Sequence, residues 1–268
     1  RYVRADKMFK GCILFNQNID SMFSQINTTS YTLQYINMTS FFQSCSVFNQ
    51  PLTIDTAYVN TMQNMFNTCT VFNQDISYFN TTRVTTMQGM FTNAYLFNSP
   101  IPRQATMLGD NSFTRGDVEG AWNVSNVKNM DSMFRGVGKA ESNRHRFNQD
   151  LNTWDFSKVT SMQHMLYCCT TYNQDISWNL TAVKKLLNTF DNTTVLAPNN
   201  LTLQTTSALT DVYRMFYRSK QLHNGTTNLA SMNVSGVTKF RDMFRESTFN
   251  ENITGWDTGS GKDFQYMF

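Results

Sequence analysis

Charged side chains and long apolar runs are both scarce in this sequence. Only 15% of the 268 residues are Asp, Glu, Lys or Arg, and Asn, Thr, Ser and Gln take their place. The formal net charge of +3 is too small to indicate a nucleic-acid-binding protein. No run of about 18 apolar residues occurs, so the sequence predicts no transmembrane segment. No signal peptide is recognisable either, and we expect a mature or trimmed chain.

Residues that carry catalysis or bind zinc are also few. The sequence has 3 His and 5 Cys, with no Cys-x-x-Cys pair, so it predicts no zinc site. No base, nucleophile and orienting acid recur together, and we therefore expect neither an enzyme nor a cofactor. Asp110, Asp117 and Glu119 in one loop are the only hint of a catalytic site, and acidic loop residues are usually just solvated.

Phe and Met are abundant instead, with 22 and 16 residues, and they recur in a repeat. The pattern M-x-x-M-F-x-x-C-x-x-F-N-Q-D-I is clearest at residues 61–77. We call the aromatic residue of its Met-Phe pair, or the residue in register with it, the marker residue. The marker residues are Phe9, Phe42, Phe66, Phe91, Phe134, Leu166, Phe190, Phe216, Phe244 and Phe268. Regular repeats are 24 to 25 residues long, a period that is typical of solenoids.

The repeat predicts one solenoid domain over residues 1–268. It has nine to ten repeats, with loop insertions near 22–31, 102–120 and 136–146. The Met-x-x-Met-Phe segment predicts a short helical or 3₁₀ turn, because apolar residues at i, i+3 and i+4 share one face. The following Phe-Asn-Gln-Asp-Ile segment predicts a short strand, and parallel strands of successive repeats stack about 4.8 Å apart. The expected fold class is therefore an α/β repeat solenoid.

Residues in register predict internal columns in such a stack. Among the marker residues, Phe66, Phe91 and Phe134 are expected in one buried column. An Asn follows the second Phe of most repeats, and its side chain is expected to bond the backbone of the adjacent repeat, because buried polar groups need partners. The Asn residues of this ladder are Asn16, Asn49, Asn73, Asn98, Asn148, Asn173 and Asn250.

Acidic residues of the same motif leave a second interpretation open. Asp75, Asp150 and Asp175 stand two positions after the Asn of their repeats. Carboxylates that gather in this way can bind Ca²⁺. Only Asp150 and Asp175 belong to consecutive repeats, so calcium remains an alternative to a purely structural motif.

Four cysteines share one position, three residues after the marker residue. They are Cys12, Cys45, Cys69 and Cys169. Cys45 and Cys69 belong to adjacent repeats, where the spacing permits a disulfide. The alternative is a buried small residue at this position, since Ala94, Thr193 and Ser219 are in register with the cysteines.

Asn-x-Ser/Thr sequons are numerous. They occur at Asn27, Asn37, Asn80, Asn123, Asn179, Asn192, Asn200, Asn224, Asn233 and Asn252. Such sequons are acceptor sites for N-glycosylation in secreted proteins. Asn80, Asn123 and Asn179 each follow the last aromatic residue of the expected strand segment, so glycans on them would line one edge of the stack.

Two segments resemble a known family. VFNQDISYFNTTRVTTMQGMF (71–91) and RFNQDLNTWDFSKVTSMQHML (146–166) are similar to the repeat of the BspA-type leucine-rich-repeat surface proteins, which include mycoplasma-lipoprotein-like proteins. The resemblance extends over nearly the whole chain. It implies leucine-rich-repeat-like coils, a cell-surface or secreted location, and a role in adhesion or protein binding without catalytic residues.

Together these features predict a non-enzymatic extracellular or cell-surface protein that binds other proteins or surface glycans. The alternative is a structural subunit that assembles head to tail into a filament. Both ends of a solenoid expose a sheet edge and a slice of apolar core, and such edges recruit another chain. The end-to-end contact would join Tyr2 and Phe9 of one copy to Phe264 and Phe268 of the next, a geometry that propagates rather than closes. The alternative is that these residues are part of a longer array of repeats.

Overall fold

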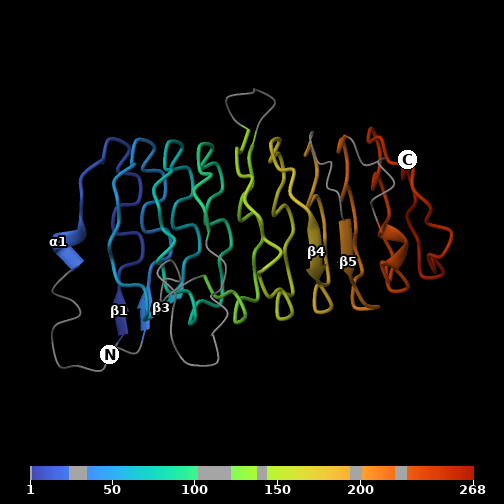
Figure 1. The fold of residues 1–268 in the computed structure, drawn as a ribbon, viewed down its shortest axis with the longest axis horizontal. Coiled ribbons are helices and arrows are strands. Elements are labelled where there is room, and N and C mark those ends of the chain that lie inside the picture. The colour runs from blue at the N-terminus through green and yellow to red at the C-terminus, as the bar shows by residue number, and fades with distance from the viewer. Residues whose placement is uncertain (1, 24–34, 102–121, 138–143, 194–200, 221–227) are drawn as a thin grey trace.

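The computed structural model describes residues 2–23, 35–101, 122–137, 144–193, 201–220 and 228–268. The repeats lie side by side in chain order along the longest axis, with the first and the last at opposite ends (Figure 1). The regular elements are short. They are β1 (Tyr2–Arg4), α1 (Asp20–Phe23), β2 (Tyr35–Asn37), β3 (Val59–Thr61), β4 (Ile176–Asn179), β5 (Leu201–Gln204) and the 3₁₀ helix η2 (Leu229–Ser231).

Parallel pairing joins each repeat to the next. β1, β2 and β3 form a parallel sheet in that order, and single parallel bridges continue the line of pairing to the last repeat. The paired residue stands five positions before the marker residue. These residues are Arg4, Asn37, Thr61, Thr86, Asn129, Ser161, Lys185, Asp211, Lys239 and Asp263. The expected short parallel strands are therefore present, and they connect the repeats in sequence order.

The line of pairing does not lie where the sequence predicts it. It runs just before the position that holds the first Met of the regular repeats, whereas the expected strand starts at Phe-Asn-Gln-Asp-Ile. Within the described residues, β4 and β5 are the strands that pair inside that segment. Elsewhere an Asn side chain replaces the backbone partner: the N–H of Asn73 donates to Asn49 Oδ1 at 2.9 Å, and the N–H of Asn98 donates to Asn73 Oδ1 at 2.8 Å.

The Met-x-x-Met-Phe segment forms a turn, closed by a hydrogen bond from the N–H of Met65 to the carbonyl of Met62 at 3.1 Å, but the predicted helical or 3₁₀ backbone is wrong. The residue two positions before the marker residue has a left-handed backbone in every repeat, with φ values of 55° at Asn64 and 62° at Gly89. An α-helix requires right-handed residues with i→i−4 hydrogen bonds. Here the N–H groups of Asn64 and Phe66 donate to the carbonyls of Gln88 and Met90 in the next repeat, at 2.8 and 2.9 Å. The i, i+3, i+4 apolar spacing fits both arrangements.

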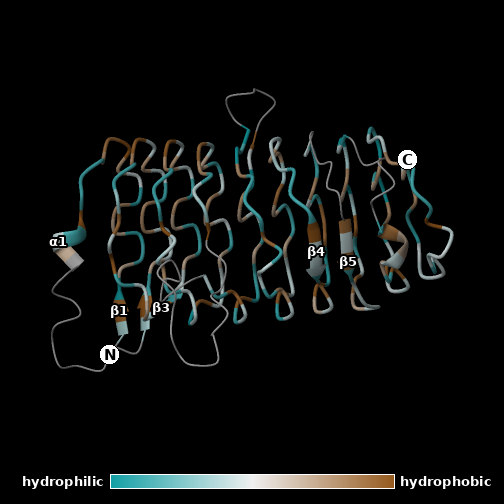
Figure 2. Ribbon diagram, in the orientation of Figure 1, coloured by the Kyte–Doolittle hydropathy of each residue, from teal (hydrophilic) through white to brown (hydrophobic). Residues whose placement is uncertain are grey.

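The aromatic column is confirmed. Ring centroids are 5.6 Å apart for Phe66 and Phe91 and 5.7 Å apart for Phe91 and Phe134, and all three rings are fully buried. In the regular repeats the marker ring also stacks on the second Phe of its own repeat, at 4.1 Å for Phe66 and Phe72 and 3.9 Å for Phe91 and Phe97. Hydrophobic and hydrophilic segments accordingly alternate along the repeats (Figure 2).

The disulfide considered for Cys45 and Cys69 is not formed, because both residues are free thiols. Each thiol donates to a backbone carbonyl of the preceding repeat: Cys45 Sγ to the oxygen of Phe9, and Cys69 Sγ to the oxygen of Phe42, both at 3.0 Å. Cys169 makes the equivalent contact at 2.9 Å. At this position, therefore, a small side chain donates a hydrogen bond that joins adjacent repeats.

The expected insertions fall largely outside the described residues. This holds for all of 102–120, for 24–31 of the first insertion and for 138–143 of the third. Within the described part of the chain, no helix has the length and apolar character needed to cross a membrane.

Candidate binding site

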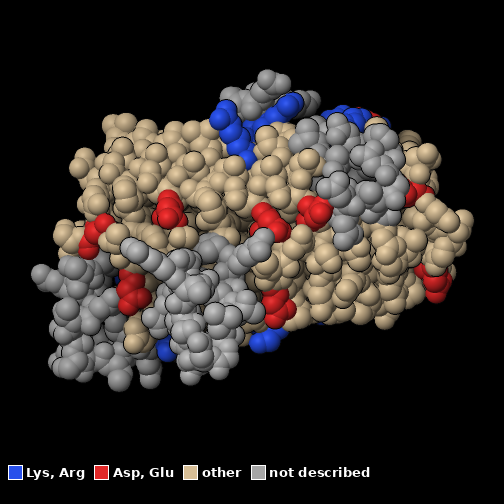
Figure 3. All heavy atoms as spheres, in the orientation of Figure 1, with Lys and Arg blue, Asp and Glu red and all other residues tan. Residues whose placement is uncertain are grey.

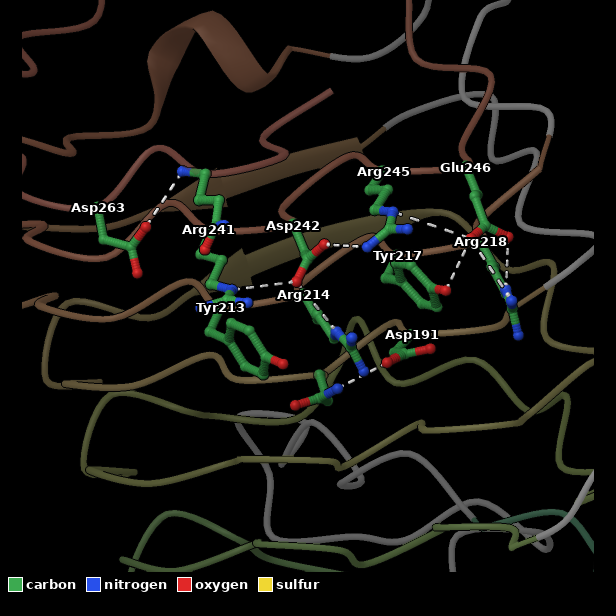
Figure 4. Close-up of polar contacts among 12 residues, drawn as sticks. Asp191, Tyr213, Arg214, Tyr217, Arg218, Arg241, Asp242, Arg245, Glu246 and Asp263 are labelled. Atoms are coloured by element: carbon green, nitrogen blue, oxygen red, sulfur yellow. Dashed lines mark hydrogen bonds and ion pairs between the residues drawn. The ribbon is translucent and has the colours of Figure 1, made fainter.

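The residues that flank the marker residues change in character along the stack. In the repeats of Phe42, Phe66 and Phe91 they are uncharged, as at Gln63, Asn67 and Thr92, and charged side chains are sparse on the face shown in Figure 3. In the late repeats the corresponding positions carry Arg, Tyr, Asp and Glu (Figure 4). We call this group the arginine–tyrosine cluster. It consists of Arg135, Tyr167, Asp191, Tyr213, Arg214, Tyr217, Arg218, Arg241, Asp242, Arg245 and Glu246.

Asp242 holds three arginines together. Its side chain is only 1% exposed, and its carboxylate lies 3.1 Å from Arg245 Nη1, 3.4 Å from Arg214 Nε and 3.6 Å from Arg241 Nε. A buried carboxylate is tolerated only where charged partners compensate for its desolvation. The three guanidinium groups supply that compensation, and their positions are thereby linked across two repeats.

Glu246 links the next part of the cluster. Its carboxylate accepts hydrogen bonds from Arg218 Nε and from the Tyr217 hydroxyl, both at 2.8 Å, and lies 3.9 Å from Arg245 Nε. The hydrogen bond from Arg218, followed by that from Tyr217, lowers the pKa of Glu246, while the bond to Glu246 raises the pKa of Arg218. Arg245 therefore connects the Asp242 and Glu246 groups.

The arginines also stack on tyrosine rings. Arg214 lies 5.2 Å from the Tyr213 ring centroid and 4.7 Å from that of Tyr217, over which Arg218 also lies, at 4.9 Å. Arg245 covers Tyr266 at 4.8 Å. Stacking and ion pairing restrict the rotamers of these long side chains, so the guanidinium groups are preorganised for contact.

A cavity of about 210 Å³ opens inside the cluster. It is lined by Tyr167, Cys168, Asp191, Asn192, Arg214, Tyr217 and Arg218. Asp191 is 3% exposed and accepts a 2.6 Å hydrogen bond from Asn188 Nδ2. Burial raises the pKa of Asp191 to about 7, although Asn188, Arg214 and Arg218 act to lower it.

Asp150 and Asp175, considered for calcium, line another cavity of about 260 Å³ with Asn152, Asn173 and Gln174. Asp75 belongs to a repeat further toward the N-terminus. No group of three or more His, Cys, Asp or Glu arranged for a metal ion occurs within the described ranges. The acidic residues that were considered for a catalytic site, Asp110, Asp117 and Glu119, lie outside the described residues.

Most of the sequon asparagines that the structure describes stabilise turns. In four of them, Asn80, Asn179, Asn233 and Asn252, Oδ1 accepts from both the backbone N–H and the hydroxyl of the Ser or Thr two positions later. Asn123 accepts the backbone N–H of Ser125 at 3.0 Å. The Asn-x-Ser/Thr pattern thus has a structural reason that is independent of glycosylation.

Asn37 makes the same turn, because its Oδ1 accepts the N–H of Thr39 at 2.8 Å, but its Nδ2 and that of Asn192 also have partners. Asn192 Nδ2 donates to Cys168 Sγ at 3.3 Å, and Asn37 Nδ2 donates to the Tyr2 hydroxyl at 3.1 Å. The nitrogen that would carry a glycan is therefore engaged at both positions. Asn27, Asn200 and Asn224 lie outside the described residues.

The side chains considered for end-to-end contact are exposed at three of four positions. Tyr2, Phe264 and Phe268 are 54%, 44% and 70% exposed. Phe9 is half-buried, because its ring stacks on Phe42 with centroids 5.5 Å apart. The two pairs lie in the first and last repeats, at opposite ends of the stack (Figure 1).

His145 belongs to the loop insertion expected near 136–146, but its side chain is fully buried. Its Nε2 is 2.9 Å from the carbonyl oxygen of Phe91, and its Nδ1 accepts the N–H of Phe147 at 3.2 Å, so Nε2 carries the proton. Burial lowers the pKa of His145 to about 4. The ring joins two repeats through a marker carbonyl, as the thiol of Cys169 does.

The arginine–tyrosine cluster was also missed. Its residues come from repeats that are 24 to 32 residues apart, and the repeats around residues 186–222 depart from the consensus in their core positions. A signal was nevertheless present. The positions two before and two after the marker residue, which are Asn64 and Thr68 in a regular repeat, are Arg214 and Arg218 in the repeat of Phe216.

The repeat is shared with other proteins. A family described as Mycoplasma protein of unknown function, DUF285, matches residues 7–108, 104–201 and 184–268. No curated protein and no solved structure matches the chain. Because the three matches together extend from residue 7 to residue 268, the chain belongs to the DUF285 family.

Proposed function

We propose that this protein is a leucine-rich-repeat-like solenoid of the BspA type that acts without catalysis at the cell surface or outside the cell, where it binds another protein. The parallel pairing that joins successive repeats supports the solenoid. Stacked repeats present an extended surface suited to binding macromolecules. The repeat motif itself supports the surface location through its resemblance to BspA-type proteins.

The arginine–tyrosine cluster carries the proposal. Tyr and Arg are enriched at protein–protein interfaces and dominate their binding energy, whereas uncharged small polar residues contribute little. The cluster places five arginines and four tyrosines, with Tyr266 counted, beside repeats whose equivalent positions are Gln, Asn and Thr. Ion pairs with Asp242 and Glu246 restrict these side chains before any partner arrives, which lowers the entropy cost of binding.

A protein partner fits the cluster better than a surface glycan. Sugars are commonly held against open aromatic faces, but Arg214 and Arg218 cover the Tyr217 ring, and Arg214 lies over Tyr213 as well. The exposed groups are therefore guanidinium edges, which suit carboxylates and backbone carbonyls.

The test is retention of intact cells of the source organism on the immobilised protein. Arg241→Ala/Arg245→Ala removes two half-exposed arginines, and Gln63→Ala/Asn67→Ala is the matched control in an uncharged repeat. We expect the first variant to retain at least tenfold fewer cells and the control to behave like the wild type, with thermal melts confirming that both are folded. Pretreatment of the cells with protease should abolish retention, and glycosidase should not. Equal retention by both variants would refute the proposal.

Head-to-tail assembly is the second proposed function. The exposed aromatic side chains of Tyr2, Phe264 and Phe268 in the first and last described repeats support it. Electron microscopy of the native material tests it, because a fibre with an axial repeat near the length of one molecule supports assembly and isolated particles contradict it.

A further inference from the structure

The cavity beside Asp191 arises from one short side chain between two long ones. The residue directly after the marker residue is Tyr167, Asp191 and Tyr217 in three successive repeats. Because adjacent repeats pair in parallel, these side chains follow one another along the stack. Asp191 reaches less far than its tyrosine neighbours, and the space that it leaves unfilled is the cavity of about 210 Å³.

Two arginines bring unused hydrogen-bond donors to this space. A guanidinium group has five N–H donors. Among the described residues, Arg214 uses its Nε on Asp242, and Arg218 uses Nε and Nη2 on Glu246. Both groups line the cavity and are held by stacking on Tyr217. The remaining N–H groups are therefore fixed in position at the cavity wall.

We propose that this cavity binds a carboxylate, supplied by an acidic side chain of the protein partner; the inference rests on the proposed function. A planar carboxylate pairs with a guanidinium edge through two parallel N–H···O bonds. A cavity of this size accepts the end of a Glu or Asp side chain and excludes a bulky group. The ligand replaces the water that otherwise solvates the free N–H groups of Arg214 and Arg218.

Asp191 at the cavity wall makes binding pH-dependent. Burial raises the pKa of Asp191 to about 7, with Arg214 and Arg218 acting to lower it and Asp242 to raise it. Tyr167, Cys168 and Tyr217 also line the cavity, and burial raises the pKa of each, so they stay uncharged near neutrality. Below pH 7 Asp191 is protonated and donates a hydrogen bond to the incoming carboxylate. Above pH 7 it repels that group.

The test uses a fluorescein-labelled hexaglutamate peptide in an anisotropy titration at low ionic strength. Hexaglutamine is the uncharged control. We expect hexaglutamate to bind, and Arg214→Gln/Arg218→Gln to weaken its affinity at least tenfold. Arg83→Gln is the matched control, because Arg83 stacks on Tyr58 at 4.9 Å far from the cavity, and it should leave the affinity unchanged. Binding no tighter than that of hexaglutamine, or equal binding by both variants, would overturn the inference.

Two further binding measurements, a pH series and a carboxylated sugar, make the test more specific. Wild-type affinity should fall between about pH 6 and about pH 8 as Asp191 ionises, whereas Asp191→Asn should keep its affinity at the higher pH. A carboxylated sugar, hexagalacturonate, should bind more weakly than hexaglutamate; the reverse order would overturn the assignment to a protein side chain. If hexaglutamate fails to bind while Arg241→Ala/Arg245→Ala still reduces cell retention, the carboxylate inference falls and the proposed function stands.

Discussion

The side-chain oxygen of Asn49 accepts the backbone N–H of Asn73 in the next repeat, at 2.9 Å. The same oxygen accepts Gln74 Nε2 at 3.0 Å. The bond recurs from Asn16 to Asn173, with lengths of 2.8 to 2.9 Å. One amide thus satisfies the backbone donor that a regular strand would have paired with a carbonyl.

Asn49→Ala should destabilise the protein by about 1 to 3 kcal/mol, because it leaves the N–H of Asn73 without its partner. Asn49→Asp is the matched control, since a carboxylate oxygen can accept from both Asn73 and Gln74. Urea denaturation of the two variants makes the comparison. Equal losses of unfolding free energy in the two variants would show that the side-chain oxygen of residue 49 does not stabilise the protein.

Phe91→Ala should cost about 3 to 5 kcal/mol, because a fully buried ring is removed between Phe66 and Phe134 and a cavity remains. Phe91→Leu fills most of that space, as Leu166 does at the same position, and should cost less. Denaturant unfolding measures both. A loss below 1 kcal/mol for the Ala variant is not compatible with a packed column.

These two predictions follow from positions that the sequence could define. A period of 24 to 25 residues places Phe66, Phe91 and Asn73 in register without any knowledge of the backbone. The Met-Phe turn could not be derived in this way, because its left-handed residue is a glycine only at Gly89 and is elsewhere a residue such as Asn64, Ser132 or Arg214. Hydrogen bonds to the next repeat stabilise that backbone, and they are invisible in a local pattern.

The binding site was beyond sequence reasoning for a related reason. Asp242 and Arg214 are 28 residues apart, and nothing in the motif marks either as functional. Only the register of the described repeats brings them within 3.4 Å of each other.

Asp191 should make stability fall as pH rises. Its pKa is raised from 3.8 to about 7 in the folded protein, so the folded state holds a proton that the unfolded state has lost. The stabilisation that Asp191 contributes to the folded state is roughly 4 kcal/mol. It is fully present below pH 4 and is lost between about pH 4 and 7. Asp191→Asn should remove this dependence in urea titrations across that range. An unchanged pH profile in the variant would contradict the burial of an ionisable carboxyl.

His145 should act in the opposite direction. Its pKa is lowered from 6.5 to about 4, so the unfolded state binds a proton first. The stabilisation that neutral His145 contributes to the folded state is roughly 3 kcal/mol. It is present above pH 6.5 and is lost as the pH falls toward 4. NMR titration of the ring protons checks this directly: no shift should occur until the pH nears 4, and a midpoint near 6.5 would place the ring in solvent.

Amide hydrogen exchange on the complex with the cell-surface partner tests the central claim most directly. The partner should be captured by the wild-type protein and identified, and exchange then compared with and without it. We expect protection to concentrate at residues 188–192, 213–218 and 241–246, with none at 61–68 and 86–93. Protection confined to the uncharged early repeats would contradict the assignment of binding to the arginine–tyrosine cluster.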